Sequence, residues 1–176
     1  MANRDALRAF QTRLANRLQE ARTSGVVASW LAVEAGEHRF LFPLSQAGEI
    51  FPWTSARPVP YTRSWFLGVA NLRGGLYGVV DLGGFVAGGS GTVRAEPVRD
   101  LSRLVALNAV LEVNCALLID RLVGLRNMEA FASSAPRPAG SPEYFGSGYT
   151  DTSGAYWQEI NLQALSQQPE FLSISA

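Results

Sequence analysis

The chain has 176 residues with 15 Arg, 15 acidic residues and no Lys, so its formal net charge at pH 7 is zero. This length suits one domain that buries its own core without disulfides or a structural metal. The charge is uneven, because residues 1–24 carry five Arg against two acids, a net +3, which leaves −3 on the remainder. A slightly acidic body disfavours nucleic-acid binding.

The single cysteine and the lack of long apolar stretches bear on the compartment. Cys115 lies in the apolar run 113–119, where a lone thiol normally packs as a small hydrophobic group, and it has no intrachain disulfide partner. No stretch reaches the about 18 consecutive apolar residues of a membrane helix, and the start lacks the apolar region of a signal peptide. The sequence therefore predicts a cytoplasmic protein with no direct membrane insertion.

Residues 2–22 carry apolar side chains at helical spacing, with Arg residues placed largely off the apolar stripe. The stripe consists of Leu7, Phe10, Leu14, Leu18 and Ala21. The pattern predicts an amphipathic helix over residues 1–24, as an extension of one domain over residues 25–176. Three roles remain open for this helix: a brace on the body, a partner contact, or a membrane-surface helix, for which a charge of +3 is weak.

From residue 29 onward the apolar period is two, in short pieces separated by Gly, Pro and Asn. Many short strands between turn signals predict a barrel or sandwich rather than βαβ units. The predicted strands are 29–34, 39–44, 49–54, 76–82, 103–109, 111–119 and 155–162. Two Gly- and Pro-rich stretches, 83–97 and 133–148, are predicted to be loops.

The block from Trp65 to Leu82, WFLGVANLRGGLYGVVDL, combines an apolar approach, a charged turn and a strand. The Asn and Gly residues of NLRGG, at positions 71–75, tolerate the left-handed backbone of a tight turn. An Arg inside such a turn presents its forked guanidinium from a short, stiff segment. The block is a candidate interaction surface, although an ordinary hairpin corner with a solvated Arg fits these residues equally well.

The stretch GVANLRG followed by VVDL, preceded by GEIFPWTSARPVPYTRSWF, resembles the CheW-like family of bacterial chemosensory adaptors. Residues 104–128 are similar to the later paired strands of that family, and residues 143–165 to its closing hairpin and short terminal helix. The resemblance implies a mainly β fold of two intertwined, five-stranded SH3-like barrels. The N-terminal extension and the short opening hairpin at 32–44 resemble the PilI-type branch, which serves type IV pili and twitching motility.

This resemblance implies a non-enzymatic adaptor that works without a cofactor. Its partners would be the cytoplasmic tip of a methyl-accepting chemoreceptor and the regulatory domain of a CheA-like histidine kinase, in an array that could include CheW-like paralogues. The protein would reach the inner face of the cytoplasmic membrane through the receptors. A conventional flagellar CheW coupling protein is the alternative within the family.

Receptor binding is carried over onto the matched positions of this chain. Glu49 and Arg73 are expected to lie close together at the receptor groove, as an ion pair. The other matched positions are Gly68, Val69, Asn71, Leu72, Gly74 and Ala47. A side chain at position 68 is expected to crowd an incoming receptor helix. The candidates for kinase binding, which the family achieves with exposed apolar strand residues, are Leu44 and Phe42.

The residue types present give little support for a catalytic site or a metal site. One His, His38, and one Cys leave a zinc site short of ligands. The Gly-rich stretch 83–91 lacks the Lys of a phosphate-binding loop, and no G-x-S-x-G elbow occurs. Two alternatives outside the family remain: a small-barrel module that binds peptides or oligosaccharides, and an enzyme with an unfamiliar site that uses Cys115.

Overall fold

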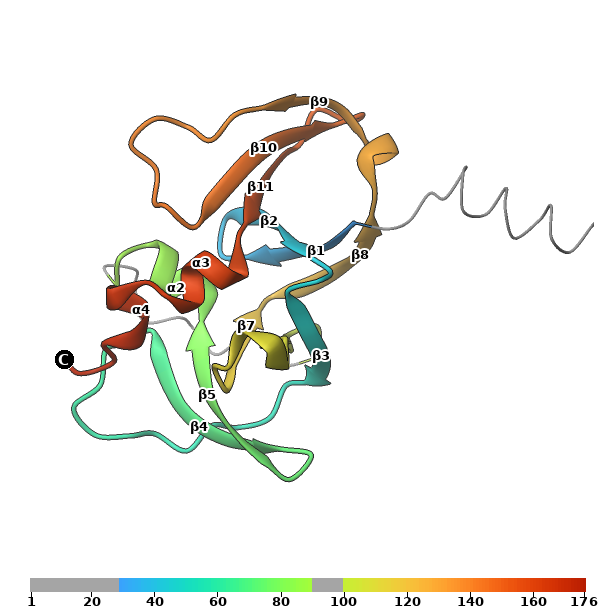
Figure 1. Cartoon of the computed structure of the whole chain (residues 1–176). Helices are drawn as coiled ribbons and strands as arrows, with labels where there is room; N and C mark the ends of the chain where they lie inside the picture. The colour runs from blue at the N-terminus through green and yellow to red at the C-terminus, as the bar shows by residue number, and fades with distance from the viewer. Residues whose placement is uncertain (1–28, 90–99) are drawn as a thin grey trace, which may run out of the picture.

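The computed structural model describes residues 29–89 and 100–176, which form two β-sheets with short helices (Figure 1). The first sheet has six strands in the order β8-β1-β2-β11-β10-β9, and the second has five in the order β3-β6-β7-β5-β4. The first sheet contains β1 (Trp30–Ala35), β2 (His38–Pro43), β8 (Arg121–Arg126), β9 (Phe131–Ala135), β10 (Phe145–Asp151) and β11 (Tyr156–Ile160). The second contains β3 (Ala47–Pro52), β4 (Phe66–Leu72), β5 (Gly75–Asp81), β6 (Arg103–Leu107) and β7 (Cys115–Ile119). The predicted mainly β architecture of two intertwined units is confirmed.

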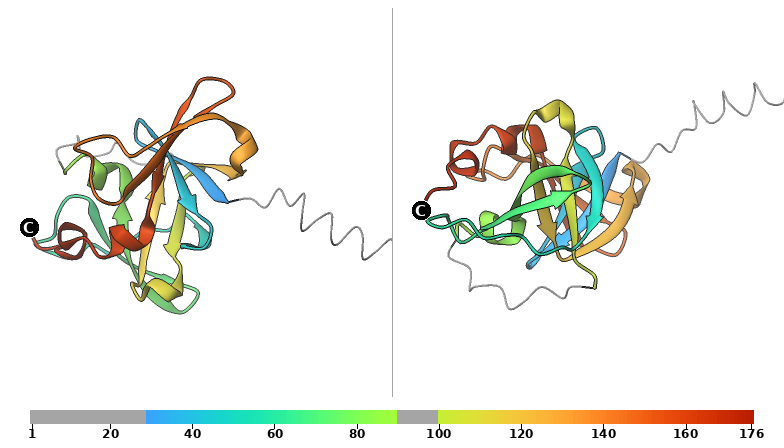
Figure 2. Two further views of the ribbon diagram at one scale, coloured as in Figure 1. Left: turned by 45° about the horizontal axis from the view of Figure 1, so that its top comes forward. Right: turned by 90° about the horizontal axis from the view of Figure 1, so that it is seen from below.

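The described helices are all short and lie mostly on one side of the molecule (Figure 1, Figure 2). They are α2 (Leu82–Val86), α3 (Leu162–Ser166) and α4 (Pro169–Leu172), with 3₁₀ turns η1 (Ala109–Leu111) and η2 (Met128–Ala130). The Asn161 side chain caps α3 by accepting a hydrogen bond from the Ala164 N–H. In the part of the chain that the structure describes, no helix is long and apolar enough to cross a membrane.

Side chains of the middle strands alternate between two cores, so both faces of these strands are buried. In β7, Cys115, Leu117 and Ile119 face a central core shared by the two sheets, whereas Ala116 and Leu118 face the interior of the second sheet. The interior of the first sheet is a smaller core of Trp30, Ala32, Leu41 and Trp157. Burial on both faces explains why these strands appear in the sequence as continuous apolar runs.

The edge strands of the second sheet are β3 and β4, and the segment that follows β3 pairs with β4. After β3 the chain crosses to β4, where Arg57 and Val69 form an antiparallel bridge. The Arg57 N–H donates to the Val69 carbonyl at 2.7 Å, and the Val69 N–H donates to the Arg57 carbonyl at 2.9 Å. We call this junction of the β3 and β4 edges, defined by Glu49, Arg57, Val69 and Arg73, the seam.

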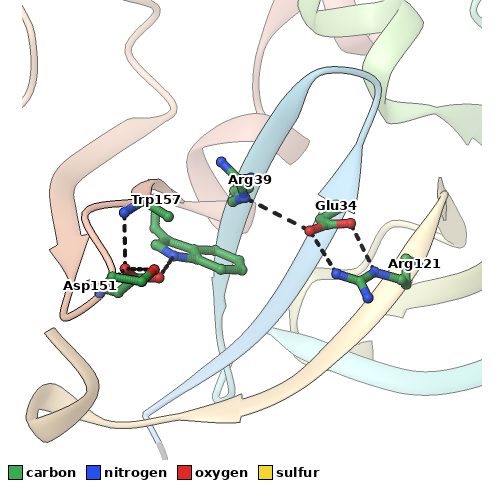
Figure 3. A network of polar contacts seen from close by, with 7 residues as sticks. Glu34, Arg39, Arg121, Asp151 and Trp157 are labelled. Atoms are coloured by element: carbon green, nitrogen blue, oxygen red, sulfur yellow. Dashed lines mark hydrogen bonds and ion pairs between the residues drawn. The ribbon is translucent and has the colours of Figure 1, made fainter.

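Two polar clusters fasten the first sheet (Figure 3). On neighbouring strands, Arg121 donates from Nε and Nη2 to the two carboxylate oxygens of Glu34, both at 2.9 Å, and Arg39 approaches the same carboxylate at 3.8 Å. The hydrogen bonds from Arg121 hold the pKa of Glu34 below its ordinary value. This cluster joins β8, β1 and β2 at one end of the sheet.

The second cluster closes the turn between β10 and β11 around Asp151. Its carboxylate accepts hydrogen bonds from the Ser153 hydroxyl at 2.6 Å and from Trp157 Nε1 and the Ala155 N–H, both at 2.9 Å. These bonds, above all that from the Ser153 hydroxyl, lower the pKa of Asp151 well below its ordinary value of 3.8. A single carboxylate thus fixes both the turn and the indole of a core tryptophan.

Several strand predictions need correction. The predicted strand 111–119 begins only at Cys115, because Glu112 has φ 57° and the preceding residues form η1. The predicted loop 133–148 is a loop only in its middle, since β9 runs to Ala135 and β10 starts at Phe145. Two strands, β4 and β8, were not among those predicted, and the predicted loop that starts at 83 begins with the helix α2. The first sheet has six strands instead of five.

The predicted helix over residues 1–24 lies outside the described residues, as do residues 90–97 of the predicted loop 83–97. The predicted short C-terminal helix is present as α3, with α4 following it.

Asp151→Asn should destabilise the protein in a pH-dependent way. Because folding lowers the pKa of Asp151, its contribution to stability is complete above the ordinary value of 3.8 and is lost as the pH falls below it. We expect the variant to melt below wild type at pH 7, and the gap to shrink as the pH falls below about 4. Thermal unfolding followed by circular dichroism measures both melting temperatures. Glu143→Gln, which removes an exposed carboxylate from the loop before β10, is the control, and a gap that persists unchanged to pH 2 would contradict this account.

Candidate partner-binding site

The tip of the β4–β5 hairpin is a two-residue turn. Leu72 pairs with Gly75, which leaves Arg73 and Gly74 as the loop, with φ values of 49° and 82°. Positive φ at both central residues is typical of a type I′ turn, whose twist matches that of the flanking strands. The Asn71 side chain accepts a hydrogen bond from the Gly74 N–H at 2.9 Å. The turn is therefore shorter than the predicted 71–75, and its left-handed residues are Arg73 and Gly74, not Asn71.

Glu49 and Arg73 form an ion pair across the seam. Arg73 Nη1 lies 2.7 Å from Glu49 Oε1, and the side chains are 76% and 44% exposed, respectively. The pair connects β3, an edge strand of the second sheet, to the turn that follows the other edge strand, β4. A guanidinium has five N–H donors, so an Arg this exposed retains donors for an acceptor supplied by another molecule.

Two of the remaining matched residues lie on one face of the hairpin. Val69 pairs with Gly78 and Asn71 pairs with Leu76, which places the four on the same side of the two strands. Leu76 is 64% exposed and was absent from the sequence-based candidates. Leu76 could have been identified from the sequence, because a two-residue turn fixes the register of both strands and so places Leu76 directly opposite Asn71.

Two further matched residues contribute little side-chain surface. Leu72 is buried in the interior core of the second sheet. Ala47 is half-buried, pairs with Leu107 and packs against the central core. Both side chains therefore offer a partner little exposed surface for contact.

Gly68 is required by this chain's own packing. It has φ 129°, and a Cβ atom there would overlap the Arg57 carbonyl group and approach Pro58. The sequence-based expectation was that a side chain would crowd an incoming receptor helix. In the structure the space is already occupied by the backbone that forms the seam.

The two candidates for kinase binding differ in exposure. Phe42 is fully buried in the central core, so the expectation of an exposed side chain is wrong for it. Phe42 pairs with Leu31 of β1, on a face of the sheet that alternation alone could not distinguish from an exposed one. Leu44, just beyond the end of β2, is exposed.

The residues that could support chemistry are scattered or buried. In residues 29–89 and 100–176, no group of three or more His, Cys, Asp and Glu side chains is placed to hold a metal ion. Burial raises the pKa of the Cys115 thiol to about 12, so the reactive thiolate is scarce at neutral pH. The seam itself carries an exposed pair of opposite charges, and Leu76 is exposed on the same hairpin.

A family model described as the CheW-like domain matches residues 29–170. The chain belongs to the CheW-like domain family. The matched span contains every described strand and α3. It also contains the seam, so the paired charges lie within the CheW-like domain itself.

Relatives and solved structures agree with this membership. The chain is 27% identical to the protein PilI of Pseudomonas aeruginosa over 153 residues, which cover 85% of this chain and 82% of PilI. It is 37% identical to the chemotaxis protein CheW of Rhizobium meliloti over 51 residues, which cover 29% and 33% of the two chains. The crystal structure of the scaffolding protein TtCheW from Thermoanaerobacter tengcongensis superposes with a TM-score of 0.62, at 18% identity, over 76% of this chain and 83% of that one. The last likeness establishes the shared fold.

The ion pair should contribute little to folding stability. For Glu49→Gln, Arg73→Gln and the double variant, we expect a coupling free energy of at most about 1 kcal/mol at low salt, because both side chains are exposed. The coupling should vanish near 1 M NaCl, where the Debye length is about 3 Å. Urea unfolding of the four proteins at two salt concentrations measures it, and a coupling above about 2 kcal/mol that survives high salt would show a structural role instead.

Gly68→Ala should destabilise the protein by about 2 kcal/mol or more, since the new Cβ must displace the Arg57 backbone and the residue must keep a positive φ. Gly140→Ala is the matched control: Gly140 also has positive φ, 75°, but an added Cβ would meet nothing within 4 Å. We expect about 1 kcal/mol for the control. Urea unfolding compares the two, and equal losses would remove the seam as the cause.

Proposed function

We propose that this CheW-like protein is an adaptor that couples a methyl-accepting chemoreceptor to a CheA-like histidine kinase, in the chemosensory system that controls type IV pili and twitching motility. The observation that supports it most directly is the exposed Glu49–Arg73 pair at the seam, at the two positions matched to the family's receptor groove. The likeness to PilI along 85% of the chain supports the assignment to twitching motility.

The site has the properties of a recognition surface. Arg73 is anchored in a two-residue turn, and its guanidinium is already oriented by Glu49, so little side-chain freedom remains to be lost on binding. A receptor carboxylate or backbone carbonyl could accept the remaining N–H donors, while Leu76 and Val69 offer apolar contact beside them. Interfaces of this kind are modest in area and reversible, as signalling contacts often are.

An adaptor has to bind its second partner on another surface. For the kinase regulatory domain we keep Leu44, which is exposed just beyond β2, and exclude Phe42. In this proposal the protein reaches the inner face of the cytoplasmic membrane only through the receptor, and it could join arrays with CheW-like paralogues.

Arg73→Glu should weaken binding to the receptor tip by about tenfold or more and leave kinase binding unchanged. The substitution places two carboxylates side by side at the seam and removes the donors that face the receptor. Isothermal titration calorimetry with a receptor tip fragment and with the kinase regulatory domain measures both affinities. Matched melting temperatures show that the fold is retained.

Two further variants sharpen the test. Arg137→Glu reverses the charge of an exposed Arg in the loop between β9 and β10 and should leave both affinities unchanged. Glu49→Arg combined with Arg73→Glu restores an ion pair with reversed polarity. If this double variant recovers stability but not receptor binding, the receptor recognises the guanidinium at position 73 itself. Failure of the wild-type protein to bind either partner would refute the adaptor proposal.

A further inference from the structure

Three large apolar side chains are exposed where the described chain begins. Leu125 in β8 is 58% exposed and Met128 in η2 is 57% exposed, and Leu44 lies just beyond β2. We call these three residues the entry patch. Chemically, the entry patch is a surface that an apolar partner would cover.

Strand register places two members of the entry patch on one face. Leu31 in β1 pairs with Leu125 on one side and with Phe42 on the other, so the three point to the same side of the sheet. Leu44 follows Phe42 by two residues and continues that face. Leu31 and Phe42 are buried in the central core, whereas Leu44 and Leu125 extend the same apolar row into solvent.

Residues 1–28 join the body between these side chains. The Ser29 N–H donates to the Arg126 carbonyl at 2.8 Å, and the Ser29 carbonyl accepts from the Leu44 N–H at 3.1 Å. The start of β1 accordingly lies between β2 and β8 (Figure 1). Ser29, where the described chain begins, therefore lies between the strand ends that carry Leu44 and Leu125.

The sequence that enters there suits this surface. Residues 2–22 carry the apolar stripe of Leu7, Phe10, Leu14, Leu18 and Ala21. The six residues 23–28 between this stretch and Ser29 span at most about 20 Å when fully extended, so the end of the stripe at Ala21 stays near Ser29 and docking is intramolecular. The net charge of residues 1–24 is +3 and that of the remainder is −3, so the two parts of the chain attract one another.

We propose that residues 2–22 dock on the entry patch of their own chain as an amphipathic helix, with the apolar stripe against Leu44, Leu125 and Met128. Docking covers Leu44, so the segment and any partner that uses Leu44 exclude one another. This inference does not rest on the proposed function, because an intramolecular cover can form whether or not the chain binds a receptor or a kinase.

Limited trypsin digestion of the full chain tests the docking, because trypsin cleaves after Arg and the segment holds Arg4, Arg8, Arg13, Arg17 and Arg22. The rate of cleavage after Arg8, followed by mass spectrometry, reports the fraction of undocked segment. Leu14→Asp on the stripe and Leu125→Asp on the entry patch should each raise this rate about tenfold, which corresponds to about 1.4 kcal/mol.

Each variant has a matched control. Asn16→Asp introduces the same charge on the opposite side of the predicted helix. Leu172→Asp makes the same substitution at a leucine of α4 that is 57% exposed and lies away from the entry patch. Both controls should cleave at the wild-type rate, and all proteins should melt at similar temperatures.

Two outcomes overturn the proposal. If wild type is cleaved after Arg8 as fast as Leu14→Asp, the segment is not docked. If protection of wild type grows with protein concentration, the segment docks on a second copy of the chain instead of on its own entry patch.

Discussion

The burial of both faces of β1, β6 and β7 is the constraint on which the rest of the structure depends. Each of these strands supplies alternate side chains to the central core and to the interior of its own sheet. A shift of one residue in β7 would exchange Leu117 with Leu118 and disturb two cores at once. Packing on both faces therefore fixes the strand register. The register in turn fixes the positions of the β4–β5 hairpin tip and of the strand edges at the seam.

At the seam, the contacts that folding requires differ from the exposed ion pair that we propose as a receptor contact. Folding depends there on the backbone bridge between Arg57 and Val69 and on the missing side chain of Gly68, all internal to the chain. The ion pair above it is exposed and adds little to stability, so evolution can alter its chemistry without loss of the fold. The charged pair can therefore change while the sheet beneath it stays constant.

The sequence was most informative where local chemistry decides the structure. Alternating residues located β1, β2 and β5 within a few positions, and the Gly-containing turn located the hairpin that carries Arg73. It failed where neighbours distant in sequence decide, as for β9 and β10, whose polar and Gly-rich residues form strands only because each pairs with an adjacent strand. Phe42 and Leu44 also show that the sequence alone does not reveal burial. Both lie on one face, but Phe42 is buried in the central core between the sheets whereas Leu44 is exposed.

The parallel pairing of β2 with β11, which joins Phe40 to Gln158, gives the two sheets different histories during synthesis. All strands of the second sheet have been synthesised once Ile119 is made, whereas the partner of β2 on its second side, β11, is made about 40 residues later. Such distant contacts slow folding, and they leave the apolar faces of β1 and β2 uncovered in the meantime. The β2 edge of the β1–β2 hairpin therefore has no partner strand until β11 has been made, and an unpaired strand edge of this kind is prone to aggregation.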